Sequence, residues 1–300
     1  MRRIAATIAV ATVAATVAMA GGAPALAAHR ATPSTATYYL SLGDSLAQGV
    51  QPNSSGVSVP TNEGYPDQLF AALHTANPTL QLVKLGCPGE TTVTMMKGGI
   101  CTTYSTGSQL AQAAAFLGAH RGHVQLVTID IGANDLNPCL PPNLTNITAI
   151  IKCLNGVFPT IQANLTTIMN TLTTASGSGP EPPIIGMNYY DPELAAWLTG
   201  TAAGKALAKD SILLAQGFGN LLAGVYTAFG AKVADVLTAF HTTQFGIKVH
   251  LPLFGQVPKA VAYICTYTWQ CAAPPVGPNI HANILGYGII ANTFLDTYLG

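Results

Sequence analysis

Charged residues are scarce in this chain of 300 amino acids. Asp, Glu, Lys and Arg together make up 8% of it, and their charges cancel to a formal net charge of zero. The sequence contains no run of Lys and Arg and no basic helix, which are the patterns typical of nucleic acid binding. We therefore expect no nucleic acid partner. Hydrophobic residues supply 49% of the chain, which is enough to bury a sizeable core.

Long hydrophobic runs are absent beyond the first 28 residues, since no later stretch reaches about 18 apolar residues without a polar interruption. At the start of the chain, two arginines precede an uncharged apolar stretch, and small residues around Ala27 form a cleavage site. We predict that residues 1–27 are a cleaved secretory signal peptide and residues 28–36 a flexible tail, which leaves a secreted protein with no membrane span. An uncleaved anchor is the alternative, but the stretch is Ala-rich and short for a span of about 20 residues.

No C-x-x-C motif occurs, which argues against a zinc site or a thioredoxin-type redox site. The chain has six cysteines, and an even number in an exported protein indicates disulfides. Six cysteines allow about 15 pairings. We predict that each cysteine pairs with its neighbour along the chain, because each such pair brackets one loop-like stretch rich in Gly, Pro, Thr or Asn. The predicted pairs are Cys87–Cys101, Cys139–Cys153 and Cys265–Cys271.

Beyond the signal, strand patterns alternate regularly with helix patterns. The predicted strands are Tyr38–Leu42, Leu80–Leu85, Gln125–Ile131, Ile184–Tyr189 and Lys232–Leu237. The predicted helices are Tyr65–Ala76, Ser108–His120, Asn155–Ala175, Ala202–Phe229 and Ala282–Tyr298. Such alternation indicates right-handed βαβ units and a parallel sheet covered on both faces. No internal repeat or domain linker is visible, so we expect residues 37–300 to form one three-layer α/β domain with about five parallel strands.

Loops that contain glycine follow the first three predicted strands, and each carries a residue suited to acyl transfer. Ser45 follows the first strand, Gly89 the second and Asn134 the third. If these strands are neighbours, their loops meet at one edge of the sheet. Acyl transfer needs a hydroxyl nucleophile, an imidazole to take its proton and fixed N–H donors for the oxyanion. His281, just before the last predicted helix, is the candidate imidazole, although Ser45 by itself also fits a helix N-cap.

These residues and their order resemble the SGNH hydrolases, which are also called the GDSL lipase/esterase family. Gly43-Asp44-Ser45-Leu46 matches the first block of the family, Gly89 the glycine of the second, Gly132-Ala133-Asn134-Asp135 the third and His281 the last. The cysteines beside the second and third blocks resemble those of secreted actinobacterial members. The resemblance covers essentially the whole mature chain. It implies a flavodoxin-like fold, Ser45 as nucleophile, His281 as base, and oxyanion donors from Ser45, Gly89 and Asn134.

The last block departs from the family pattern. The family usually has Asp three residues before the histidine, where the carboxylate holds the imidazole in the right tautomer. Here that position is Pro278, and the nearer Asn279 is uncharged. We predict that the backbone carbonyl of Pro278 accepts a hydrogen bond from Nδ1 of His281, and that Ser45 and His281 act as a dyad. A distant Asp or Glu that folds into this place is the alternative.

The resemblance implies a secreted carboxylic ester hydrolase that needs no cofactor or metal. Acyl transfer, thioester cleavage and carbohydrate deacetylation are alternative reactions, and a catalytically inactive ligand-binding protein is an alternative of a different class. We expect a monomer whose substrate is a small-molecule or lipid ester. Apolar loop segments such as Leu251–Gly255 favour an acyl chain over a sugar, and Tyr189–Pro192, after the fourth strand, is a candidate pocket wall. The G-x-S-x-G elbow of α/β-hydrolases is absent around Ser45.

Overall fold

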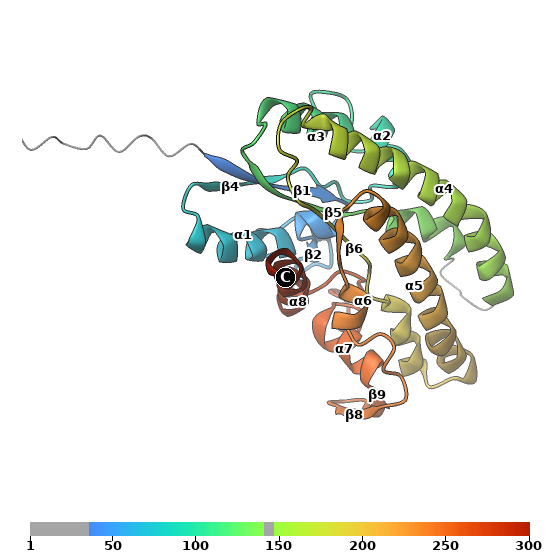
Figure 1. Cartoon of the computed structure of the whole chain (residues 1–300). Helices are drawn as coiled ribbons and strands as arrows, with labels where there is room; N and C mark the ends of the chain where they lie inside the picture. Colours follow the sequence, from blue (N-terminus) through green and yellow to red (C-terminus); the bar gives the residue numbers. More distant parts are fainter. Residues whose placement is uncertain (1–35, 141–146) are drawn as a thin grey trace, which may run out of the picture. The chain divides into compact units, whose positions relative to one another are not determined.

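Figure 1 shows the computed structural model of the chain, which describes residues 36–140 and 147–300. The predicted signal peptide, residues 1–27, and the predicted tail, except for Ala36, lie outside the described residues. A sheet of five parallel strands has the order β4-β1-β5-β6-β7. The strands are β1 (Thr37–Gly43), β4 (Leu80–Lys84), β5 (Val124–Asp130), β6 (Ile184–Met187) and β7 (Lys232–Ala234). The predicted α/β fold is thus confirmed, and β1 lies between the two strands whose loops were expected to meet its own.

Alternate strand residues face two separate hydrophobic cores, one on each side of the sheet. In β1, Tyr39 belongs to one core, whereas Leu40 and Leu42 belong to the other. The Tyr39 side is covered by α1 (Tyr65–Ala76), α6 (Val236–Ala239), α7 (Lys259–Tyr267) and α8 (Ile284–Leu299). The Leu40 side is covered by α2 (Thr92–Lys97), α3 (Gln109–Ala119), α4 (Ile147–Ala175) and α5 (Ala202–Ala228). The sheet is therefore the middle of three layers.

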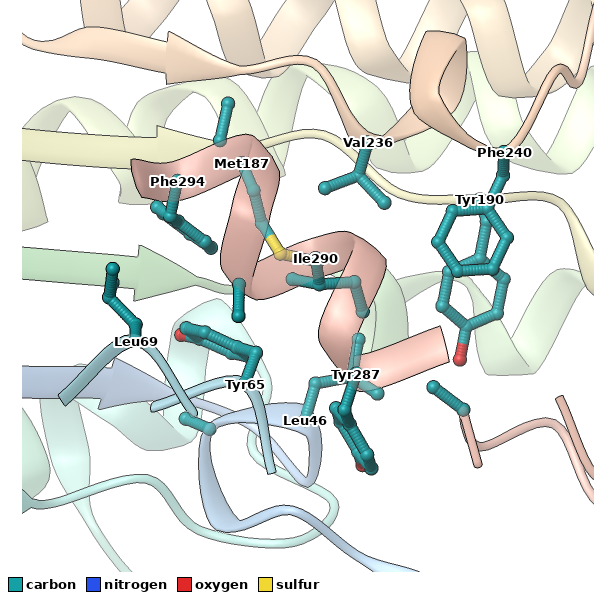
Figure 2. Close-up of a cluster of buried hydrophobic side chains, with 14 of the residues drawn as sticks. Leu46, Tyr65, Leu69, Met187, Tyr190, Val236, Phe240, Tyr287, Ile290 and Phe294 are labelled. Carbon is teal, nitrogen blue, oxygen red and sulfur yellow. The ribbon is translucent and has the colours of Figure 1, made fainter. Parts of the chain in front are cut away.

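The core on the Tyr39 side fixes α8, the helix that follows His281. Figure 2 shows Tyr65 of α1 beside Phe294 of α8, and the two rings stack with their centroids 4.8 Å apart. At the other end of α8, the hydroxyl of the buried Tyr287 donates a hydrogen bond to the backbone oxygen of Val50 at 2.8 Å. These contacts hold the start of α8 against the segment that follows β1.

The structure also contains short elements that the sequence does not predict. Besides α2, α6 and α7, they are the 3-10 helices η1 (Leu46–Gln48), η2 (Ala133–Cys139) and η3 (Pro192–Thr199), and the hairpins β2 (Gln51–Pro52) with β3 (Ser58–Val59) and β8 (Lys248–Leu251) with β9 (Gly255–Pro258). Helix α4 begins at Ile147, earlier than the predicted start at Asn155, although Pro159 lies within the helix. The buried residues Ile150 and Leu154 extend its apolar face toward its start, and this packing outweighs the local breakers.

All three predicted disulfides are present, between Cys87 and Cys101, Cys139 and Cys153, and Cys265 and Cys271. The part of the chain that the structure describes contains no free cysteine. Across residues 36–140 and 147–300, no helix has the length and apolar character needed to cross a bilayer.

Candidate active site

Ser45 lies in a sharp turn between β1 and η1, at the carboxyl edge of the sheet. Gly43 ends the strand with a φ of 137°, and a Cβ atom there would lie 2.1 Å from the backbone oxygen of Asp130 on the adjacent strand. Only glycine fits this crowded position. Asp44 closes the turn because its Oδ1 accepts a hydrogen bond from the N–H of Leu46 at 2.9 Å.

The structure brings the predicted nucleophile and base together from positions far apart in the sequence. Oγ of Ser45 lies 2.9 Å from Nε2 of His281, which is hydrogen-bonding distance. His281 is mostly buried, and burial lowers its pKa to about 4. The imidazole is therefore neutral at neutral pH and has a nitrogen available to accept the proton of the serine.

The other ring nitrogen of His281 contacts the side chain of Asn279, with 2.7 Å between Nδ1 and Oδ1. The prediction that the backbone carbonyl of Pro278 takes this place is wrong. The physical reason is an Asx turn, in which Oδ1 of Asn279 also accepts a hydrogen bond from the backbone N–H of His281 at 3.1 Å. That turn brings the amide oxygen, rather than the preceding carbonyl, against the ring. No distant Asp or Glu among residues 36–140 and 147–300 occupies this place either.

The contacts of Oδ1 of Asn279 with the backbone N–H and with Nδ1 of His281 also determine the tautomer of the imidazole. A backbone N–H can only donate, so the atom of Asn279 that faces it is the amide oxygen. The amide nitrogen then points the other way and donates to Oγ of Ser58 at 2.9 Å. Because Oδ1 can only accept, Nδ1 of His281 carries the proton and Nε2 is the free acceptor that faces Ser45.

The loop that carries His281 is held from several directions. The Cys265–Cys271 disulfide closes the preceding turn, and Trp269 pairs with the loop through its backbone, donating to the oxygen of His281 and accepting from the N–H of Asn279. The β2–β3 hairpin holds the loop from the N-terminal part of the chain, since Nε1 of Trp269 donates to Oε1 of Gln51 at 3.2 Å. These contacts therefore fix the loop that carries the imidazole of His281.

The second and third loops are tied to each other beside Ser45. Gly89 has a φ of 83°, with no atom near the position of a Cβ, so the backbone conformation rather than crowding favours glycine. Nδ2 of Asn134 donates to the backbone oxygen of Glu90 at 3.0 Å, which leaves one of its two hydrogens free. Asp135 accepts from both the N–H and the hydroxyl of Thr92, at 2.8 and 2.6 Å, and so ties the third loop to the second.

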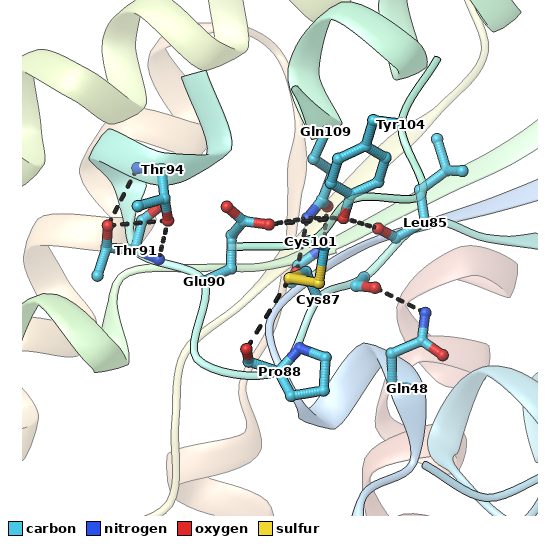
Figure 3. The surroundings of a disulfide bond; sticks show 12 residues. Gln48, Leu85, Cys87, Pro88, Glu90, Thr91, Thr94, Cys101, Tyr104 and Gln109 are labelled. Atoms are coloured by element: carbon cyan, nitrogen blue, oxygen red, sulfur yellow. Dashed lines mark hydrogen bonds between the residues drawn. A yellow bond between two sulfur atoms is a disulfide. The ribbon is translucent and has the colours of Figure 1, made fainter. Parts of the chain in front are cut away.

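A buried glutamine links the first and second loops. Gln109 accepts a hydrogen bond from the N–H of Gly43 at 2.6 Å and donates to the oxygen of the same residue at 2.9 Å. Its amide nitrogen also lies 3.0 Å from Oε2 of Glu90 (Figure 3). Tyr104, beside the Cys87–Cys101 disulfide in the same view, donates to the backbone oxygen of Leu85 at 2.6 Å. Thr91, the residue after Glu90, is the N-cap of α2, and its side chain accepts a hydrogen bond from the N–H of Thr94.

Two carboxyl groups are buried together next to Ser45. Asp44 and Asp130 are 2% and 0% exposed. Burial raises the pKa of Asp130 well above its usual range, with a further contribution from Asp44, and burial likewise raises the pKa of Asp44. Tyrosine hydroxyls donate to both groups, from Tyr65 to Asp130 and from Tyr189 to Asp44. Burial and the neighbouring Asp44 therefore disfavour the ionisation of both carboxyls together.

A cavity of about 340 Å³ opens beside Ser45 and His281. One wall is polar, because it comes from the segment after β6 that the sequence singles out, Tyr189–Pro192, together with Glu193 and Ser211. Within it, Ser211 donates to Asp191 at 2.6 Å, and burial raises the pKa of Asp191 to about 7. The apolar wall is formed by residues of η2, α4 and α5 and by Leu140 after η2. Its side chains are Leu136, Leu140, Leu154, Phe158, Leu214 and Phe218. Asn134 also lines the cavity.

No group of three or more His, Cys, Asp and Glu side chains among residues 36–140 and 147–300 has the arrangement to hold a metal ion. The residues at the cavity instead offer a hydroxyl, a neutral imidazole and amide donors, which is the set that acyl transfer uses.

Comparison with known proteins agrees with this geometry. The model of the GDSL-like Lipase/Acylhydrolase family matches residues 41–251, a range that includes Ser45, Gly89 and Asn134 and ends before His281. Phospholipase A1 from Streptomyces albidoflavus NA297 is 18% identical, with a TM-score of 0.53 over 88% of this chain and 100% of that one. An extracellular lipase from Streptomyces rimosus is 18% identical, with a TM-score of 0.52 over 87% of this chain and 100% of that one. No curated protein matches the chain.

Proposed function

Because this chain belongs to the GDSL-like lipase/acylhydrolase family, we propose that it is a secreted carboxylic ester hydrolase that forms an acyl-enzyme on Ser45. The observation that carries this proposal is the contact between Ser45 and His281, with the ring held in the productive tautomer by Asn279. Three disulfides fit an oxidising compartment outside the cytoplasm, which supports the secreted location.

In the proposed mechanism, Nε2 of His281 accepts the proton of Ser45 as Oγ attacks the ester carbonyl carbon. The tetrahedral intermediate collapses when the imidazolium returns this proton to the departing alcohol oxygen, which leaves the acyl group on Ser45. A water molecule then attacks the acyl carbon while Nε2 takes one of its protons. A second collapse releases the acid and returns a proton to Oγ, so the enzyme is regenerated.

We assign the oxyanion donors to the N–H groups of Ser45 and Gly89 and to Nδ2 of Asn134. The support is that the loops of all three residues meet at one edge of the sheet, and that one amide hydrogen of Asn134 remains free. Such fixed donors stabilise the charge that develops on the carbonyl oxygen. Asn279 is a positioning residue, because it acts on the substrate only through the ring of His281.

The acyl chain of the substrate is assigned to the apolar wall of the cavity. A chain of methylene groups gains about 0.8 kcal/mol for each group that it buries there, whereas a sugar would leave its hydroxyls without partners along this wall. The wall is backed by a small hydrophobic cluster around Cys139, Ile150 and Leu154, which is separate from the two main cores. The Cys139–Cys153 disulfide joins η2 to α4 within this cluster and so fixes the wall.

The test is hydrolysis of p-nitrophenyl esters by wild type, by Ser45→Ala and by Ser54→Ala, which changes an exposed serine on the β2–β3 turn and serves as the control. We expect Ser45→Ala to lose nearly all activity and a fluorophosphonate probe to label wild type and Ser54→Ala at Ser45 alone. Activity of Ser45→Ala within tenfold of wild type contradicts the assignment of the nucleophile. A wild type without turnover or labelling supports an inactive binding protein instead.

A further inference from the structure

The β8–β9 hairpin carries an apolar tip that the proposed function does not use. Leu253 at the turn is 100% exposed and Phe254 is 44% exposed. Leu253 adopts a φ of 71°, a conformation that costs a non-glycine residue free energy. Leu253 and Phe254 together form the hairpin tip. In Figure 1 the hairpin lies beyond α7, on the side away from the central sheet.

The surroundings of the hairpin are basic and aromatic. Nζ of Lys248, the first residue of β8, lies 4.3 Å from the ring centroid of Trp197, and Nζ of Lys205 lies 5.3 Å from the same ring. The sequence from Val236 to Leu295 contains Lys248 and Lys259 but no Asp or Glu. Positive charge beside exposed apolar and amphipathic aromatic side chains is the combination that binds the boundary between lipid headgroups and acyl chains.

We propose that the hairpin tip inserts into a lipid surface and that the neighbouring lysines bind anionic headgroups. The charge of the partner follows from Lys205 and Lys248 beside Trp197, and its apolar layer follows from the fully exposed leucine. A protein partner would have to cover a tip of only two residues, whereas a bilayer accepts so small an insertion.

The helix η3 connects the wall of the cavity to the base of the hairpin. This helix begins at Pro192 in the cavity wall and reaches Trp197, whose ring contacts Phe245 and Lys248 next to the hairpin. At about 2 Å of rise for each residue, these two points of the helix are roughly 10 Å apart. Provided that the proposed function holds, the hairpin would bring the cavity to the surface of aggregated lipid esters.

The experiment measures cosedimentation of the protein with phosphatidylcholine vesicles, with and without added phosphatidylglycerol. Wild type should bind the anionic vesicles better, and salt should weaken the binding. The variant Leu253→Asn/Phe254→Ser removes the apolar tip, and Asn tolerates the positive φ. We expect its vesicle binding to fall about tenfold or more, because two apolar side chains no longer leave water. Leu213→Gln, which changes a leucine 72% exposed on α5, is the matched control and should bind as wild type does.

Two further measurements separate this proposal from the proposed function. Ser45→Ala should bind vesicles as wild type does, and the tip variant should retain wild-type hydrolysis of a soluble short-chain ester while it loses activity on the ester in vesicles. Equal vesicle binding by wild type and the tip variant would overturn the inference, whatever the esterase result. Self-association of wild type that the tip variant abolishes, without vesicle binding, would overturn it in favour of a contact between two copies.

Discussion

Asn279 and His281 share a hydrogen bond of 2.7 Å between Oδ1 and Nδ1, so a neutral amide occupies the place where a carboxylate usually orients the imidazole. An amide oxygen fixes the tautomer as a carboxylate does, because both can only accept. It brings no negative charge, however, and therefore does not offset the burial that lowers the pKa of His281 to about 4. The geometry of a triad is kept while the charge of the third member is absent.

Replacing Asn279 with Asp should move the acid limb of the pH profile of kcat/KM upward. His281 can accept the proton of Ser45 only when its imidazole is neutral. Activity should therefore fall as pH decreases through the pKa of His281, which in wild type is about 4. A carboxylate beside Nδ1 favours the imidazolium and should raise the midpoint of this limb by about one to three pH units. Ser58 is placed to donate its hydroxyl hydrogen to the second carboxylate oxygen.

The control for this change is Ser58→Ala, which removes the other partner of the Asn279 side chain without touching the ring and should leave the limb in place. Asn279→Ala should lower kcat, since the ring loses its orienting acceptor, with little change in KM. If the acid limb of the pH profile has the same midpoint in wild type and in Asn279→Asp, Asn279 does not contact the ring of His281 during the reaction.

Filling the cavity from α5 should shorten the acyl chain that the enzyme prefers. Ala215 lines the cavity between Leu214 and the ring of Phe218, so Ala215→Phe places a ring where the distal methylene groups would lie. We expect kcat/KM for long-chain esters to fall about tenfold or more while the value for acetyl esters changes little. Ala206→Phe, on an exposed position of the same helix, is the control and should keep the wild-type profile. A proportional loss on all chain lengths would place the acyl chain elsewhere.

The stability of the protein should depend on pH through the buried pair of Asp44 and Asp130. Because burial raises the pKa of Asp130, the folded protein binds more protons than the unfolded chain above about pH 4. Stability is therefore lost as pH rises through the folded-state pKa, by up to about 1.4 kcal/mol for each pH unit and proton. Asp130→Asn removes this titration, so urea midpoints at about pH 5 and about pH 8 should differ less than in wild type. Equal differences in the two proteins would mean that Asp130 does not hold a proton.

A methyl group at Gly43 should be poorly tolerated. Its Cβ would lie 2.1 Å from the backbone oxygen of Asp130, and its φ of 137° is one that Ala rarely adopts. Gly43→Ala should therefore lower the free energy of unfolding by about 3 kcal/mol or more. Gly217→Ala, at an exposed position of α5 with no atom near the added carbon, should instead raise it by about 0.5–1 kcal/mol. Denaturant unfolding of both variants measures the two changes in the free energy of unfolding. If Gly43→Ala lowers this free energy by no more than an ordinary surface substitution does, the Cβ atom is not crowded at this position.

The sequence predicts the sheet well because strands buried on both faces are continuous apolar runs between loops that contain glycine. It does not predict the hairpins, since β2 consists of only Gln51–Pro52 and the β8–β9 turn contains Leu251–Gly255, which is apolar without alternation. Helix α4 begins before its predicted start because the burial of Ile150 stabilises the first turns of the helix. This burial outweighs the low helix propensity of Gly156.

Sequence patterns predict Ser45 and His281 as the reacting pair, because serine and histidine are residue types that can act as nucleophile and base and because their neighbours mark the loops. They miss Asn279, since an uncharged residue two positions before the histidine does not fit a search for a carboxylate. The short polar side chain of Asn279 is itself the signal that could have identified it. The side chain of Asn commonly accepts a hydrogen bond from the backbone N–H two residues later, which here belongs to His281, and this turn directs the amide oxygen at the ring of His281.

The three disulfides have a consequence for how the protein is made. Their cysteines are separated by 14, 14 and 6 positions, and each pairs with the next cysteine along the chain. If such a chain emerges N-terminus first into an oxidising space and each pair closes before the next cysteine emerges, every new cysteine meets only its right partner as a free thiol. Oxidation in order of emergence gives the native pattern, so maturation requires no exchange between mispaired cysteines.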